Sequence, residues 1–140
     1  MDMDVEHANG ACHCRSVRFR VCLADGLHSP RRCTCSYCRM RGAVALTARV
    51  GDLEIIEGAA MLTLYQFNTN TAKHFFCSRC GIYTHHQRRS NPEEYGINAA
   101  CLDGISPFDF AEVTVSDGVN HPTDSGRSKV AGVLKFIPSE

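Results

Sequence analysis

Cysteine placement constrains this 140-residue chain more than any other feature, because seven of its nine cysteines fall into three short clusters. The clusters are Cys12/Cys14, Cys33/Cys35/Cys38 and Cys77/Cys80. Two thiolates from one tight turn can reach the same zinc ion at about 2.3 Å, so such spacing favours metal ligation. Gly81 directly follows the third cluster and can take the positive φ that such a turn often needs. The sequence therefore predicts a zinc protein.

The number of clustered cysteines predicts two sites. Four thiolates close a tetrahedral zinc, whereas three leave one coordination position open, as catalytic zinc sites do. In a four-plus-three division, the open site is Cys33, Cys35 and Cys38, and the closed site is Cys12, Cys14, Cys77 and Cys80. Spacing alone also allows one zinc ribbon of Cys35/Cys38 with Cys77/Cys80, which leaves Cys33 as a spare thiol. Redox-active thiols without metal are a third alternative.

Charge and hydropathy exclude several partner classes. The formal net charge is +0, from 15 basic and 15 acidic residues, so nothing global favours nucleic acid or an anionic membrane. The N-terminus is acidic and lacks an apolar core, which argues against a secretory signal. No apolar run approaches the roughly 18 residues of a membrane helix. We therefore expect a cytoplasmic protein whose cysteines are not paired as disulfides.

Short apolar segments predict a mainly β fold. In residues 17–23 apolar side chains alternate with Arg18, Arg20 and Cys22, as in a strand with one wet face. The other candidate strands are residues 43–50, 53–57, 61–67, 73–76, 81–87, 95–102 and 130–137, with Gly51-Asp52 read as a turn. No strongly periodic helix is evident, and a turn near residues 107–111 is the best candidate. We expect one antiparallel domain over residues 10–140, after a loose tail over residues 1–9.

Several residues outside the zinc ligands have competing interpretations. His85 and His86 are adjacent in a predicted strand, so at most one can face a pocket. Cys22 is expected to be partly exposed and Cys101 buried. The short basic clusters are expected to be solvated surface; they are Arg31–Arg32, Arg39 with Arg41, and Arg88–Arg89. An alternative role for Arg39 and Arg41 is to offset the charge of the second site or to hold a carboxylate.

The ordered motifs resemble those of a known family. Gly10-x-Cys-His-Cys14, Cys33-x-Cys-x-x-Cys38 and Phe76-Cys-Ser-Arg-Cys-Gly81 are similar to the motifs of the glutathione-dependent formaldehyde-activating enzyme (GFA) family, which includes the centromere protein V-like domain. The resemblance runs from about Gly10 to about His121 and includes Asp117-Gly118 with His121-Pro122.

The resemblance implies a fold, ligands and an activity. The fold is a single-domain β-tent, shared with methionine sulfoxide reductase B and Rab-binding zinc chaperones. The implied structural zinc ligands are Cys12, Cys14, Cys77 and Cys80, and a labile catalytic zinc is implied at Cys33, Cys35 and Cys38. The implied activity is that of a carbon–sulfur lyase, which joins glutathione and formaldehyde into S-(hydroxymethyl)glutathione.

The residues themselves suggest how such a reaction could run. An open position on a three-thiolate zinc can bind the substrate sulfur, and Tyr37, His85 or His86 can supply the proton for the aldehyde oxygen. Three thiolates already exceed the charge of zinc, which weakens it as a Lewis acid. An alternative is that the site exchanges its zinc for glutathione. The alternatives are a non-catalytic zinc module that binds a protein partner and a thiol redox protein.

Overall fold

The computed structural model describes residues 2–119 and 129–140, and its strands form one continuous sheet. The strands are β1 (His7–Ala11), β2 (Arg18–Leu23), β3 (Arg31–Cys33), β4 (Ala45–Glu57), β5 (Leu62–Tyr65), β6 (Lys73–Cys77), β7 (Tyr83–Gln87), β8 (Glu94–Asn98), β9 (Glu112–Ser116) and β10 (Val130–Lys135). The main order is β10-β9-β3-β4-β8-β7-β6-β5, and β1 and β2 attach through β4. The predicted mainly β fold is confirmed.

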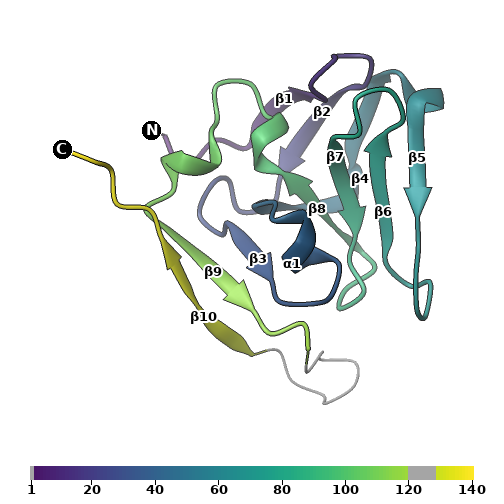
Figure 1. The fold of residues 1–140 in the computed structure, drawn as a ribbon. Helices are drawn as coiled ribbons and strands as arrows, with labels where there is room; N and C mark the ends of the chain where they lie inside the picture. The colour runs from purple at the N-terminus through teal and green to yellow at the C-terminus, as the bar shows by residue number, and fades with distance from the viewer. Residues whose placement is uncertain (1, 120–128) are drawn as a thin grey trace.

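Strand pairing is antiparallel with one exception among the described residues. β3 runs parallel to β9, with Arg31 opposite Thr114 and Cys33 opposite Ser116. A long stretch of chain separates these two strands, as a parallel pair requires. The arrangement attaches the β9–β10 hairpin beside the second cysteine cluster (Figure 1).

β2 shows how an alternating sequence pattern gives a strand one buried face and one exposed face. Its apolar side chains Phe19, Val21 and Leu23 are buried, whereas Arg18 and Arg20 are exposed. Successive side chains of a strand point to opposite faces, so the apolar set enters the core together. β2 is held by β1 on one side and β4 on the other.

Two sequence-based boundaries differ from the structure. The tail expected over residues 1–9 includes the start of β1, which pairs with β2, and the Met3 carbonyl accepts a hydrogen bond from the Leu27 N–H at 2.8 Å. The turn expected at Gly51-Asp52 is wrong, because β4 continues through it and pairs with β2 across two register shifts. Neither β1 nor β3 has an apolar pattern of its own, so pairing with neighbours defines both strands.

The main core lies between β2, β4 and β8. Phe19, Leu27, Leu46 and Ile97 are among its largest fully buried side chains. A second, smaller cluster forms around Cys12, Val17 and Cys77, with Met61 and Leu62 packed against it. Two separate apolar clusters therefore stabilise the fold, and one of them contains cysteine ligand candidates.

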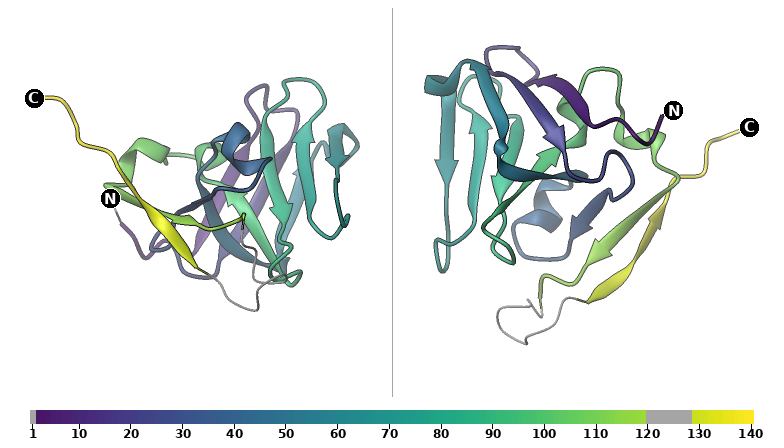
Figure 2. Two further views of the ribbon diagram at one scale, coloured as in Figure 1. Left: turned by 60° about the horizontal axis from the view of Figure 1, so that its bottom comes forward. Right: turned by 180° about the vertical axis from the view of Figure 1, so that it is seen from behind.

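The helical segments are short. The α-helix α1 (Cys38–Arg41) is a single turn that ends at Gly42, and the 3-10 helices are η1 (Ala59–Met61), η2 (Ala99–Cys101) and η3 (Pro107–Asp109). α1 lies between the β9–β10 hairpin and the β5–β8 part of the sheet (Figures 1 and 2). Within the described ranges, no helix is both long enough and apolar enough to cross a membrane.

Candidate metal centres and the adjoining pocket

The first cysteine cluster joins two turns that are distant in sequence. Cys12 and Cys14 follow β1, and Cys77 and Cys80 occupy the turn between β6 and β7. Each turn is closed by a backbone hydrogen bond, from the Cys12 N–H to the Val17 carbonyl and from the Cys77 N–H to the Ile82 carbonyl, both 3.0 Å. Gly81 takes a φ of +78°, the positive value expected from the sequence.

The geometry of this cluster suits a four-thiolate zinc. All four sulfur atoms lie within 4.8 Å of one another, and Cys14 Sγ is 3.7 Å from Cys12 Sγ and 3.8 Å from Cys77 Sγ. A tetrahedral ion with sulfur ligands at about 2.3 Å separates those ligands by roughly 3.8 Å. The donor set and its spacing therefore fit zinc.

The surroundings of the first cluster favour a structural role. Cys12 is 3% exposed and Cys77 is 0% exposed. The backbone N–H groups of Val17 and Arg79 donate to Cys12 Sγ and Cys77 Sγ at 3.3 and 3.4 Å. Burial raises the pKa of the Cys12 thiol to about 11, so a bound cation is needed to hold it as a thiolate at neutral pH.

The second cluster lies at the end of β3 and the start of α1. Cys33, Cys35 and Cys38 are each partly exposed, and their sulfur atoms lie within 4.8 Å of one another. The N–H groups of Cys35 and Cys38 donate to the sulfur atoms of Cys33 and Cys35 at 3.4 and 3.3 Å. Contacts with the Cys33 and Cys38 thiols lower the pKa of Cys35, so the cluster favours one thiolate within the set.

Arg41 connects the second cluster to the aromatic side chains beside it. Its guanidinium donates to Cys38 Sγ at 3.4 Å and to Nδ1 of His74 at 3.0 Å. The same group lies 3.8 Å from the centre of the Tyr83 ring and 4.9 Å from that of Tyr37. A cation fixed in this way offsets negative charge on the cysteine sulfurs.

Gly118 brings the β9–β10 hairpin against the second cluster. A Cβ atom at this position would lie 2.3 Å from Cys33 Sγ and 2.8 Å from the Cys35 backbone nitrogen. The Gly118 N–H also donates to the Thr34 hydroxyl at 3.0 Å. Only glycine allows this approach without displacing the cysteines.

A pocket of about 160 Å³ opens beside the three cysteines. Its wall contains Cys33, Cys35 and Cys38, together with His74, His86 and one carboxylate, Asp117. Five arginines also line it, and they are Arg31, Arg32, Arg41, Arg88 and Arg89. The pocket is therefore a thiol-bearing and strongly cationic site, unlike the closed first cluster.

The two adjacent histidines face opposite sides of β7, as expected. His86 lines the pocket, whereas His85 stacks on Phe75 with ring centres 4.6 Å apart and meets the edge of Tyr95. Burial, followed by the Arg41 charge, lowers the pKa of His86 well below its ordinary value. His86 is therefore neutral at pH 7.

Hydrogen bonds favour particular protonation states of the pocket histidines. Nδ1 of His74 accepts from Arg41, so neutral His74 carries its proton on Nε2. The Tyr83 hydroxyl donates to the Gly96 carbonyl at 3.2 Å and lies 2.7 Å from Nδ1 of His86. This arrangement favours a proton on Nδ1 of His86 and a free lone pair on its Nε2.

Sequence reasoning placed some of these residues and missed others. The structure brings the seven cysteines together as four and three, rather than as the ribbon pairing of Cys35/Cys38 with Cys77/Cys80. Cys101 is buried and Cys22 half-buried, as expected. Arg88 is buried, which contradicts its assignment to solvated surface, and Arg39 is exposed. His74 was not anticipated, and no sequence motif marks it.

Other residues that the sequence suggested for the site either do not line the pocket or lie outside the described residues. The Tyr37 ring is tilted against that of His74, with ring centres 4.5 Å apart, and the structure does not place Tyr37 in the pocket wall. His121 and Pro122, part of the family resemblance, lie outside the described residues. All nine cysteines are free of disulfide bonds.

Comparison with known proteins decides the family. The sequence pattern of the glutathione-dependent formaldehyde-activating enzyme family matches residues 7–114. This chain belongs to the GFA family. The match runs from β1 into the first part of β9 and includes all seven clustered cysteines.

Two relatives add detail. A Halomonas elongata protein named "Putative glutathione-dependent formaldehyde-activating enzyme" is 36% identical over 80 residues, which are 51% of this chain and 50% of that protein. The chain thus matches about half the length of this curated relative. A Rhodobacter sphaeroides protein of known crystal structure is 60% identical, with a TM-score of 0.75 over 76% of this chain and 98% of that one.

Proposed function

We propose that this GFA-family chain is a zinc-dependent carbon–sulfur lyase that joins a thiol, glutathione or a close analogue, to formaldehyde or a related aldehyde. The observation that carries the proposal is the contrast between the two cysteine clusters. In the described part of the chain, the cluster of Cys33, Cys35 and Cys38 opens into a pocket that also contains two histidines, whereas Cys12 and Cys77 of the first cluster are buried. A thiol and a small aldehyde need such an accessible site, and family membership supports the choice of reaction.

The proposal assigns different roles to the two clusters. Cys12, Cys14, Cys77 and Cys80 would hold a structural zinc, since four sulfurs complete a tetrahedral site. Cys33, Cys35 and Cys38 would hold a labile zinc. Zinc bound there supplies an open coordination position, which favours the thiolate form of a substrate thiol.

The histidines of the pocket can manage the proton of the reaction. The substrate sulfur attacks the aldehyde carbon, a carbon–sulfur bond forms, and the π electron pair moves to the oxygen. The thiol proton passes first to Nε2 of His86, which has a free lone pair, and then to the alkoxide oxygen. Because burial lowers the pKa of His86, its protonated form gives up that proton readily.

His74 lies next to His86, with ring centres 5.3 Å apart, and acts together with Arg41. Nε2–H of His74 can donate a hydrogen bond to the oxygen as negative charge develops there. Arg41 fixes this histidine through Nδ1 and lies against Cys38 Sγ, so one cation positions both groups. This chemistry requires reduced thiols, which supports the proposed location in the cytoplasm.

A magnetization-exchange measurement tests the reaction directly. Nuclear magnetic resonance exchange rates of glutathione with formaldehyde should rise above the buffer rate when the zinc-loaded protein is added. Cys35→Ser should abolish the increase, and Cys22→Ser, a half-buried cysteine outside both clusters, should retain it. Equal rates with and without the wild-type protein would rule out the formaldehyde reaction.

Zinc counting tests the two metal roles. We expect two zinc ions per chain, falling toward one when excess glutathione competes for the second site. A count of one zinc that glutathione does not change would favour a non-catalytic zinc module instead.

A further inference from the structure

Arg88 is the least expected charged residue in the described part of the chain. Its side chain follows β7 and is 3% exposed, although it carries a permanent positive charge. Nη1 donates to the Thr47 hydroxyl at 2.8 Å and to the Glu94 carboxylate at 3.1 Å. Nη2 is buried and has no hydrogen-bond partner within residues 2–119 and 129–140. A buried, charged donor without a partner is costly, so its presence needs an explanation.

The residue that carries this unpartnered donor is part of the wall of the pocket beside the cysteines. Arg88 lines that pocket, and so does Arg31 of β3. After burial, the charge of Arg31 is the next largest cause that lowers the pKa of Arg88, so the two guanidinium groups lie close enough to repel each other. Glu94 neutralises part of this charge, and Asp117 is the only carboxylate in the described pocket wall.

We propose that Arg88 and Arg31 form a carboxylate subsite, which binds one carboxylate of the thiol substrate while its sulfur lies at the three cysteines. This inference rests on the proposed thiol chemistry and specifies the substrate class as an anionic thiol. A carboxylate would accept from Nη2 of Arg88 and reduce the repulsion between the two arginines. Uncharged thiols of similar size lack this anchor and bind more weakly.

The two arginines that the sequence suggested for a carboxylate, Arg39 and Arg41, are less suited to this role. Arg41 uses both of its terminal nitrogens on Cys38 and His74, so it belongs to the thiol end of the pocket. Arg39 is exposed and is not part of the pocket wall. We therefore assign the carboxylate-binding role to Arg88 and Arg31 rather than to Arg39 and Arg41.

Calorimetry with S-methylglutathione tests this subsite without any thiol chemistry. This probe keeps both carboxylates of glutathione and has no free thiol. We expect Arg88→Gln and Arg31→Gln each to weaken its binding roughly ten- to hundredfold, the usual effect of losing a hydrogen bond to a charged group. The matched control is Arg20→Gln, an exposed arginine on β2 that should bind as wild type does.

Two further measurements keep the result interpretable. Arg31 is half-exposed, so Arg31→Gln tests the subsite even if Arg88→Gln does not fold. The diethyl ester of S-methylglutathione should bind wild type and both variants equally weakly. If the wild-type protein binds this ester as well as the free acid, or if neither variant weakens the free acid, the carboxylate subsite is wrong.

The two proposals fail separately. N-acetylcysteamine, a thiol without a carboxylate, reports on the cysteine end of the pocket. If N-acetylcysteamine binds the wild type and both variants equally, and S-methylglutathione does so too, the subsite is wrong and the thiol chemistry still stands. If the arginine variants weaken the binding of S-methylglutathione but the protein does not catalyse formaldehyde exchange, the subsite stands and the proposed reaction is wrong.

Discussion

The two cysteine clusters contain the same donor atoms in opposite surroundings. In the four-cysteine cluster, Cys12 and Cys77 are buried against Val17, and two turns close around the sulfurs. In the three-cysteine cluster, the sulfurs are partly exposed, a short helix begins at Cys38, and an arginine-rich pocket lies beside them. The comparison teaches that accessibility and neighbouring charge, rather than ligand type, separate the proposed structural site from the proposed catalytic one.

The largest difference between the clusters should appear in stability. Cys77→Ser removes a fully buried ligand from the first cluster, and we expect the free energy of unfolding to fall by several kcal/mol, on the order of 5. Cys35→Ser should change stability much less, because its cluster joins only β3 and α1. Chemical denaturation of both zinc-loaded variants measures the contrast. Equal losses of stability would show that both clusters are structural.

The next largest effect should come from the cation beside the second cluster. Arg41→Met removes the donors to Cys38 Sγ and His74 while keeping much of the side-chain volume. We expect the catalysed exchange rate to fall roughly ten- to hundredfold, together with zinc affinity at the second site.

Arg79→Met is the matched control beside the first cluster, where Arg79 is exposed. It should leave both zinc ions and the exchange rate unchanged. An Arg41→Met variant with wild-type activity would contradict the role given to this arginine.

Two glycines allow a smaller and site-specific comparison. Gly118→Ala places a Cβ against Cys33 Sγ and should destabilise the second cluster by about 1–3 kcal/mol. Gly81→Ala meets no atom within 4 Å but strains a positive φ beside the first cluster, at a cost of about 1–2 kcal/mol.

Zinc-release rates with a weak chelator measure both effects. Release should accelerate from the second site in Gly118→Ala and from the first site in Gly81→Ala. The reverse assignment would break the proposed separation of the clusters.

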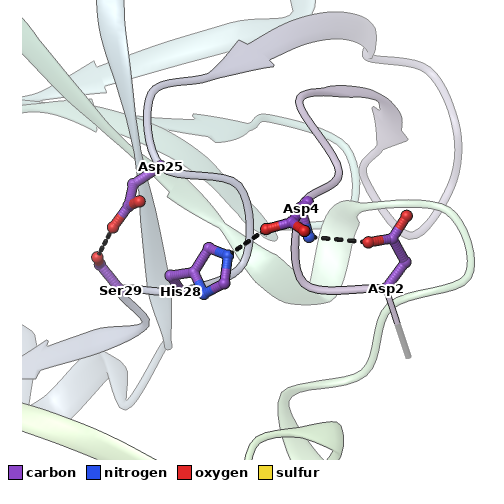
Figure 3. A network of polar contacts seen from close by, with 5 residues as sticks. All are labelled: Asp2, Asp4, Asp25, His28 and Ser29. Carbon is purple, nitrogen blue, oxygen red and sulfur yellow. Dashed lines mark hydrogen bonds and ion pairs between the residues drawn. The ribbon is translucent and has the colours of Figure 1, made fainter.

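The smallest expected effect is a pH dependence far from both clusters. Nε2 of His28 lies 2.6 Å from the Asp4 carboxylate, and Ser29 hydrogen-bonds to Asp25 nearby (Figure 3). The hydrogen bond to Asp4 raises the pKa of His28 above its ordinary value. The stabilisation is therefore fully present at low pH, below the unfolded-state pKa, and is lost as pH rises through the raised pKa.

A nuclear magnetic resonance titration of the His28 ring checks this effect. Asp4→Asn should return the His28 pKa toward its ordinary value and leave zinc content at both clusters unchanged. An unaltered His28 titration in that variant would contradict the assigned pair.

The cysteine spacing and the family motifs predicted the two cysteine groups that the structure contains, because the members of each short cluster are local in sequence. The alternation in β2 likewise fixed a strand and its buried face. β1 and β3 were missed, since pairing with β2, β4 and β9 creates them rather than any pattern of their own. Arg88 was read as surface because a charged dipeptide carries no signal that one of its side chains is buried.

The sequence by itself determined that this protein is mainly β, that its clustered cysteines have spacings suited to metal ligation, and that only one of His85 and His86 can face a pocket. These conclusions depend on local spacing and on the two-residue period of a strand. Spacing left two pairings of the cysteines open, and the tertiary structure decided that Cys12 and Cys14 meet Cys77 and Cys80. It alone showed that Arg41, Arg88 and His74 line the pocket beside the second cluster. Those contacts join segments far apart in the chain, and burial and charge at such sites depend on which strands lie side by side.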